Sequence, residues 1–234
     1  MPGRLRSTAD VHARFHNHRK RCATMRMIRA ALAAATLAAT ATCAVAQPVE
    51  AAGVRFDQSV QVGGKPLVLN GVGVRFRGIF KVAAIALYLA KKAETAEAAL
   101  AQPGPKRIQM VMLRSVSPND VGRVLSNGIE GNVTRQEFIA VLPGLARIGE
   151  VASQLKTMSH GDSIAIEWSP EGGGASFFVN GNRVAGPYGD YAAFTGFAKI
   201  WLGQNPMDKP LKEALLGRPS AAAGAVDVNP YHFR

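Results

Sequence analysis

One row of polar residues has a spacing that could support chemistry. Asp120, Arg123 and Asn127 are spaced i, i+3 and i+7, so a helix at this point would place all three side chains on one side. A carboxylate, a guanidinium and an amide in one row could bind a polar ligand. Periodicity alone favours a solvated helix face, with Asp120 and Arg123 forming a weak ion pair. Both interpretations stay open.

A second candidate is Arg75, which ends the glycine-rich segment 71–75 just before the most apolar stretch of the chain, 80–90. A guanidinium carries a planar fork of donors that suits a carboxylate or a polarised oxygen. Arg75 could therefore hold an anion at the mouth of a cavity. It could equally cap the edge of a sheet, and composition does not distinguish the two.

Several kinds of chemistry have little support in this sequence. No glycine-rich phosphate loop precedes a helix, and the only histidines after residue 46 are His160 and His232, far apart in the chain. A zinc site or a Ser-His-Asp triad is therefore not expected, and no cofactor is predicted. Both cysteines, Cys22 and Cys43, lie in the first 46 residues, which excludes disulfides and thiol chemistry from the rest.

Residues 1–46 have the pattern of a leader with a signal peptide. Basic residues precede an apolar run over 30–41, and Ala44-Val-Ala46 is the small-residue pattern of a cleavage site. We expect cleavage near Ala46 and a periplasmic or secreted protein. The apolar run is about a dozen residues, whereas a membrane span needs roughly 20, so no transmembrane anchor is expected after the leader is removed.

The leader also accounts for most of the positive charge. It holds eight of the 28 Lys and Arg residues and one of the 16 acidic residues, so the net charge of +12 falls to +5 without it. The high isoelectric point is therefore no argument for a nucleic-acid partner.

The remaining chain predicts one domain over 47–218, followed by a flexible tail over 219–234. Turn signals and alternation predict strands over 54–62, 66–69, 80–90, 107–113, 163–168, 175–179 and 183–185, with a turn at Asn70-Gly71. Capping residues and 3.6-residue periodicity predict helices over 94–102, 117–127, 134–155, 190–202 and 210–216, with a kink or break at Pro143-Gly144.

The order of these elements is strands, helices, strands and helices again, without repeated strand–helix–strand units. The prediction is an α+β fold in which a largely antiparallel sheet carries helices on one face. The strand over 80–90 is apolar on both of its faces, which predicts a central strand that is covered on both sides.

Three blocks of the sequence resemble the chalcone isomerase-like family. Leu69-Asn-Gly-Val-Gly-Val-Arg75 with Phe80-Lys-Val-Ala-Ala-Ile-Ala-Leu-Tyr-Leu89 is similar to the family's Gly-x-Gly-x-Arg signature and the strand after it. The resemblance continues at 117–127 and 200–212, and so extends over about 54–217. It implies an open-faced β-sandwich, a large antiparallel sheet against a layer of helices, with a ligand held between them.

The resemblance also implies where a site would lie. Plant isomerases of the family add a phenolate to an enone with arginine, threonine, tyrosine, lysine and asparagine side chains. Arg75 and Asn127 match the family's arginine and asparagine, and Arg123 stands where lysine is expected. Asp120 stands in place of the catalytic tyrosine. A carboxylate can replace a phenol as the donor to a developing enolate only when it is protonated, and a neighbouring Arg123 would favour its charged form.

Two further positions depart from the isomerase pattern: Ala83 replaces a threonine, and Ile200 replaces a later Thr or Ser. The chain thus resembles the non-catalytic members that bind fatty acids. The implied ligand is a small amphipathic molecule, a fatty acid or a phenolic compound. The implied ligand-binding residues are Arg75, Arg123, Asn127, Asp120, Ala83 and Ile200. Two alternatives are an isomerase of the intramolecular lyase type and a structural or accessory protein with a closed pocket.

Overall fold

A computed structural model describes residues 47–154 and 157–218 of the chain. The predicted leader with its cleavage site, the tail over 219–234 and the end of the predicted helix at 155 lie outside these residues. Within them, no helix is long and apolar enough to cross a bilayer.

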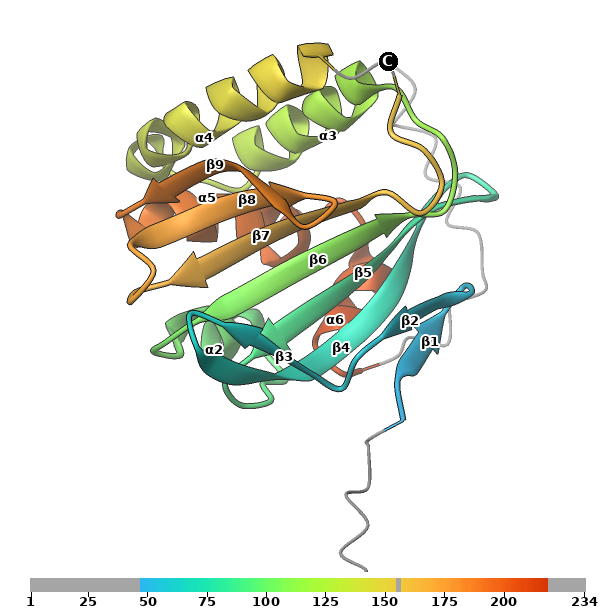
Figure 1. The fold of residues 1–234 in the computed structure, drawn as a ribbon, viewed down its shortest axis with the longest axis horizontal. Helices are drawn as coiled ribbons and strands as arrows, with labels where there is room; N and C mark the ends of the chain where they lie inside the picture. The colour runs from blue at the N-terminus through green and yellow to red at the C-terminus, as the bar shows by residue number, and fades with distance from the viewer. Residues whose placement is uncertain (1–46, 155–156, 219–234) are drawn as a thin grey trace, which may run out of the picture. The chain divides into compact units, whose positions relative to one another are not determined.

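A seven-stranded antiparallel sheet forms the centre of the fold (Figure 1), with the strands in the order in which they occur in the chain. Its strands are β3 (Ser59–Val62), β4 (Lys65–Arg77), β5 (Phe80–Leu89), β6 (Lys106–Met112), β7 (Ser163–Ser169), β8 (Gly174–Val179) and β9 (Asn182–Tyr188). A separate hairpin consists of β1 (Val49–Ala51) and β2 (Val54–Phe56). The single strand predicted over 54–62 is wrong, because β2 pairs with β1 whereas β3 pairs with β4.

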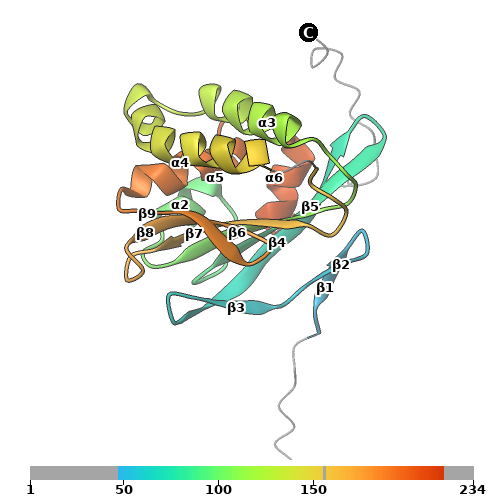
Figure 2. The same ribbon diagram turned by 45° about the horizontal axis from the view of Figure 1, so that its top comes forward.

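The helices cover one face of this sheet (Figure 2). They are α2 (Ala96–Ala101), α3 (Pro118–Glu130), α4 (Arg135–Gln154), α5 (Tyr191–Leu202) and α6 (Lys209–Leu215). In Figure 2, α5 and α6 lie next to the sheet, α3 and α4 lie outside α5, and the β1–β2 hairpin lies on the opposite side of the sheet. This arrangement confirms the predicted α+β fold.

From Ala83 to Leu89, strand β5 is buried on both faces, as its sequence predicts. Ala83, Ile85 and Leu87 belong to the core cluster beneath the helices. Ala84 and Ala86 belong to a second cluster beneath the β1–β2 hairpin. Because neither face of this part of β5 meets water, the apolar and polar alternation of a half-exposed strand is lost.

The turn predicted at Asn70-Gly71 is wrong, since β4 runs through both residues. Asn70 is the extra residue of a β-bulge between Leu69 and Gly71. Its buried side chain donates hydrogen bonds to the carbonyl oxygens of Ala93 (3.0 Å) and Leu215 (2.7 Å) and accepts one from the Ala93 N–H (2.7 Å). These tertiary contacts decide the conformation. The actual turn is at Gly78-Ile79.

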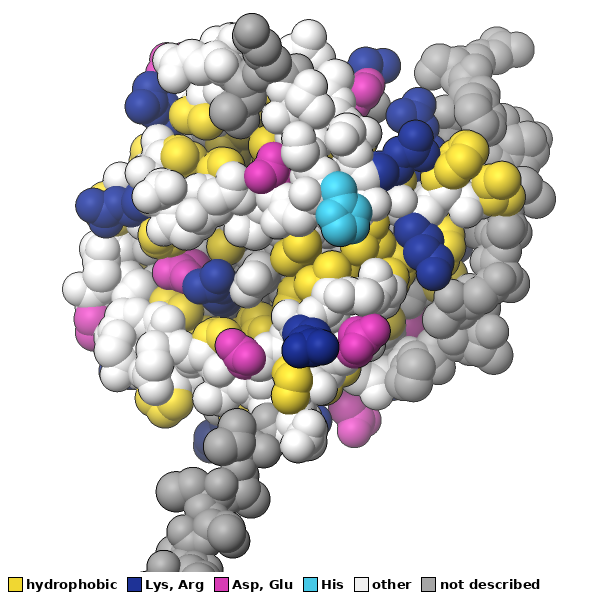
Figure 3. Space-filling model, turned by 45° about the vertical axis from the view of Figure 1, so that its right-hand side comes forward, with side chains coloured by type: hydrophobic (Ala, Val, Ile, Leu, Met, Phe, Trp, Pro, Cys, Tyr) yellow, Lys and Arg dark blue, Asp and Glu magenta, His cyan; other side chains and the backbone are white. Residues whose placement is uncertain are grey.

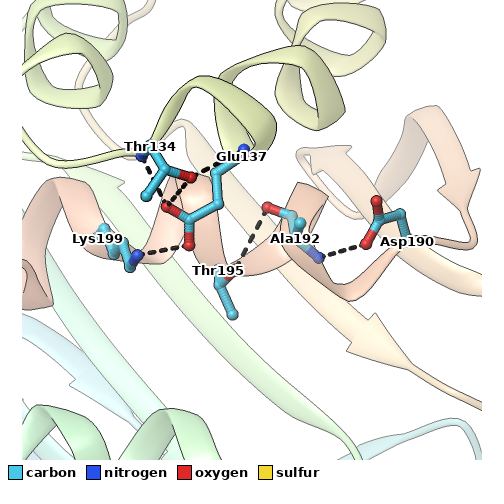
Figure 4. Close-up of polar contacts among 6 residues, drawn as sticks. All are labelled: Thr134, Glu137, Asp190, Ala192, Thr195 and Lys199. Atoms are coloured by element: carbon cyan, nitrogen blue, oxygen red, sulfur yellow. Dashed lines mark hydrogen bonds and ion pairs between the residues drawn. The ribbon is translucent and has the colours of Figure 1, made fainter.

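An ion pair joins α4 to α5, and local polar contacts cap both helices (Figure 4). Thr134 and Glu137 form the predicted capping box of α4, and Glu137 also accepts a hydrogen bond from Lys199 of α5. Burial by itself would raise the pKa of Glu137, but the hydrogen bonds from Lys199 and Thr134 outweigh it and lower the pKa. Asp190 caps α5 by accepting from the Ala192 N–H at 2.8 Å. Helix α4 continues through Pro143 without a break.

Candidate functional site

An apolar cavity of about 40 Å³ lies between the sheet and the helix layer. The lining side chains come from strands β6 to β9 and from helices α3, α4 and α5: Ile108, Met110, Val121, Leu125, Ile148, Val151, Ile164, Ile166, Phe177, Phe178, Val179, Val184 and Trp201. None of these side chains is ionisable. The lining can therefore gain from contact with alkyl or aromatic groups, but it has no acid, base or nucleophile to offer a reaction.

Trp201 supplies the one strong hydrogen-bond donor among these side chains. Its residue is 3% exposed, and the indole Nε1 is buried without an acceptor in the described part of the chain. A buried N–H without a partner is rare and destabilising. An oxygen atom of a ligand or a water molecule would satisfy it.

Arg75 lies on the helix-covered face of β4, where it pairs with Ala83 of β5. Gly71 and Gly73 precede it on the same face, and both lie directly under α6. The Nε of Arg75 is buried and has no acceptor among the described residues. Burial lowers the pKa of Arg75; the nearby Asp208 carboxylate opposes this shift, and Arg77 adds to it. Arg75 is thus a partly desolvated cation whose donors are incompletely used.

The three polar residues predicted on one helix face do share α3, but they lie outside the cavity lining. The guanidinium of Arg123 donates to the Asp120 carboxylate at 2.7 Å, and the Arg123 side chain is 66% exposed. Asp120 also contacts the cap residue Ser117 at 3.1 Å. Asn127 is exposed. This is the solvated face with an ion pair that periodicity favours, and such a pair contributes a few tenths of a kcal/mol.

The two predicted apolar positions are completely buried in the helix-side core. Ala83 packs beneath the helices, and the Ile200 side chain fills the space above Gly128, where an added Cβ would lie 2.7 Å from it. None of the six predicted site residues lines the cavity. Trp201 follows the predicted residue Ile200, and Leu125 lies on the same helix as Arg123. The sequence does not show that Trp201 and Leu125 line one cavity, because their contact depends on how α3 and α5 pack.

Lys106 is a second buried cation, 1% exposed. Its ammonium donates to the Gln102 carbonyl and to the Gly104 carbonyl (3.3 Å), and it lies 5.0 Å from the centre of the Tyr191 ring. Desolvation lowers its pKa to about 8. These contacts satisfy carbonyl oxygens at the C-terminal end of α2, so the buried ammonium of Lys106 has a structural role.

Comparison with known proteins identifies the class. The family model described as chalcone isomerase-like matches residues 48–217, and this chain therefore belongs to the chalcone isomerase-like family. The crystal structure of the Arabidopsis thaliana fatty-acid binding protein AtFAP1 is similar, with 15% sequence identity and a TM-score of 0.50 over 76% of this chain and 98% of that chain. At this identity the likeness shows the fold alone. A search of curated protein sequences gives no match.

Nearly the whole of AtFAP1 corresponds to about three quarters of this chain. Residues 47–218 contain every strand and helix described above.

Proposed function

We propose that this chalcone isomerase-like protein is a non-catalytic binding protein for a small amphipathic ligand such as a fatty acid. The observation that carries the proposal is the cavity lining, which is apolar throughout and contains no ionisable group. Such a lining favours an alkyl chain and offers nothing to acid–base catalysis. The fatty-acid binding named for the structurally similar AtFAP1 supports the same ligand class.

Arg75 is the group that would bind the carboxylate of this ligand. Met110 of the cavity lining pairs with Ile85, which pairs with Gly73, two residues before Arg75. Two strand spacings and two residues of rise place the Cα atoms of Met110 and Arg75 roughly 12 Å apart. A fatty acid is long enough to extend between them.

A ligand of this size needs more room than the cavity provides. Small-molecule sites commonly measure about 300–1,000 Å³, far above the 40 Å³ present here. Binding would therefore require the α3 residues Val121 and Leu125, or the α4 residues Ile148 and Val151, to move away from the sheet. The contact energy with the alkyl chain would have to exceed the loss of their packing.

Tryptophan fluorescence can test ligand binding at a defined position, because the chain contains only two tryptophans. The variant Trp168→Phe leaves Trp201 in the cavity lining as the single emitter. We expect saturable quenching when a fatty acid brominated on its alkyl chain is added. Trp201→Phe, which leaves only Trp168, is the matched control and should respond much less. Equal responses, or quenching that never saturates, would contradict binding in the cavity.

The role of Arg75 can be tested separately. Wild-type protein should bind lauric acid at least about ten-fold more tightly than its methyl ester, since a hydrogen bond to a charged group contributes about 1.5–3 kcal/mol. Arg75→Gln should remove this preference. Arg123→Gln tests the second predicted guanidinium and should change the preference less, because Arg123 is exposed and paired with Asp120. An unchanged preference in Arg75→Gln would exclude the predicted contact.

The second candidate is an accessory protein with a closed pocket. The complete burial of Ala83 and Ile200, and the small volume of the cavity, favour it. Native mass spectrometry of protein purified from its own compartment distinguishes the two. A co-purified lipid supports the carrier, whereas an apo spectrum together with no response of Trp201 to fatty acids supports the closed form. Neither form should accelerate cyclisation of a hydroxychalcone above background, because Asp120 cannot replace a phenol donor.

The proposed place of action is outside the cytoplasm, in the periplasm or the medium. The support is the apolar run over 30–41 and the Ala44-Val-Ala46 pattern. N-terminal sequencing of the protein recovered from fractionated cells should begin near Gln47. A cytoplasmic protein that retains residues 1–46 would contradict export.

A further inference from the structure

The tip of the β4–β5 hairpin exposes two large hydrophobic side chains. Ile79 is 70% exposed and Phe80 is 56% exposed. Gly78 has a positive φ of 58°, whereas the φ of Ile79 is not positive, as in a type II′ turn. Such a turn reverses the chain within two residues. The turn places Ile79 at the apex of the hairpin, and Phe80 follows it as the first residue of β5.

Neighbouring strands do not cover this tip. Strand β6 begins to pair with β5 only at Ala83, and β3 pairs with β4 only over residues 65–68. The last residues of β4 and the first of β5 thus extend beyond both neighbours, as the right-hand side of Figure 1 shows. A protruding tip can reach a flat surface without a change in the rest of the fold.

Basic side chains surround the two apolar ones. Arg77, Lys81 and Arg114 are all exposed, and the Arg114 guanidinium lies 4.8 Å from the centre of the Phe80 ring. The chain has no Asp or Glu between Asp57 and Glu94, so both strands of the hairpin are free of acidic residues. Figure 3 turns this side of the molecule toward the viewer and shows Lys and Arg side chains beside exposed hydrophobic ones.

We propose that this tip docks on the surface of a lipid membrane that carries anionic headgroups. Apolar side chains at the apex with cations around them match the boundary between acyl chains and charged headgroups. A protein partner fits less well, because a stable protein interface buries about 800 Å² on each side, far more than one two-residue turn offers. This inference does not depend on ligand binding in the cavity, although a membrane would be a source of amphipathic ligands.

Vesicle co-sedimentation tests the proposal with fragment 47–218, which lacks the basic leader. The probes are vesicles of phosphatidylcholine alone and of phosphatidylcholine mixed with phosphatidylglycerol. We expect binding to the anionic vesicles and little to the neutral ones. Removing one basic charge should weaken binding about five-fold, since each Lys or Arg near an anionic surface contributes about 1 kcal/mol.

Two tip variants and two matched controls separate the contributions. The charge variant is Arg77→Gln with Lys81→Gln, and its control is Lys91→Gln with Lys92→Gln at another exposed site. The apolar variant is Ile79→Ser with Phe80→Ser, and its control is Ile139→Ser with Leu142→Ser, the exposed hydrophobics of α4. We expect at least about a ten-fold loss in each tip variant and less than a two-fold change in each control.

Insertion of the tip into the membrane can also be measured directly, without the serine and glutamine variants. Phe80→Trp, placed in a chain with Trp168→Phe and Trp201→Phe, should show a blue-shifted emission on anionic vesicles only. Equal binding to neutral vesicles, equal losses in the control variants, or an emission that remains that of an exposed indole would each overturn the proposal.

Discussion

Substituting Gly71 by alanine tests why the fold needs glycine at this point of β4. A Cβ at Gly71 would lie 2.1 Å from the Ala214 carbonyl oxygen and 2.6 Å from that of Leu215, both in the backbone of the last turn of α6. Backbone atoms cannot rotate aside, so α6 would have to move by roughly 1 Å to reach ordinary contact distances. Overpacking of a core costs about 1–3 kcal/mol, and here the upper end applies.

The same movement weakens a second interaction. Asn70 donates to the Leu215 carbonyl at 2.7 Å, and such a buried hydrogen bond contributes about 1 kcal/mol. Replacing glycine recovers about 0.5–1 kcal/mol, because alanine has less freedom in the unfolded chain. The net loss should be about 3 kcal/mol. For a domain of this size the Tm should fall by roughly 6–12 °C.

Thermal and urea unfolding of fragment 47–218, followed by circular dichroism, measure this loss. Gly122→Ala is the control: nothing lies within 4 Å of its Cβ position inside α3, so alanine should stabilise by up to about 1 kcal/mol. Gly73→Ala should cost less than Gly71→Ala, because its closest contacts are 2.8 Å instead of 2.1 Å and one of them, Leu211 Cδ1, is the end of a side chain that can rotate. A Tm for Gly71→Ala within about 2 °C of wild type would refute the reasoning.

Two more predictions concern buried polar groups. Asn70→Ala should lower the free energy of unfolding by about 3 kcal/mol in urea titrations, because it leaves backbone groups of Ala93 and Leu215 unpaired; a loss below about 1 kcal/mol would mean that water replaces the amide. Burial lowers the pKa of Lys106 to about 8, so between pH 8 and 10 the unfolded chain binds more protons than the folded one. Stability should therefore rise over this interval by about 2–3 kcal/mol in wild type, and much less in Lys106→Met.

Local signals in the sequence explain why most of the fold could be predicted. Each of these signals depends only on residues that are close together in the chain. They are the capping pair Thr134 and Glu137, the Asn180-Gly181 turn and the apolar residues on both faces of 80–90. Asn70-Gly71 is the instructive error. As a dipeptide it favours a turn, but hydrogen bonds to residues 23 and 145 positions away hold it in a strand. No local pattern contains those partners.

The candidate site was harder to predict, because a cavity is the space that remains unfilled after side chains from several elements have packed together. The spacing of Asp120 and Arg123 correctly indicated a shared helix face, but the two groups satisfy each other in solvent. Trp201 and Val121 read as ordinary members of apolar stripes. Both side chains line the cavity together with side chains from strands and helices far apart in sequence, and the Trp201 indole N–H has no acceptor among the residues that the structure describes.

The two glycines and the arginine of segment 71–75 act as one structural unit. Gly71 and Gly73 leave no side chain under α6, so the helix can approach the strand closely. That approach brings Asp208, the N-cap of α6, near enough to Arg75 to oppose the lowering of its pKa. Asp208 already accepts from the Leu211 N–H at 3.0 Å, and it forms no ion pair with Arg75 within the described chain. The Asp208 carboxylate offsets part of the cost of burying the Arg75 guanidinium, and the Arg75 Nε has no acceptor among the described residues.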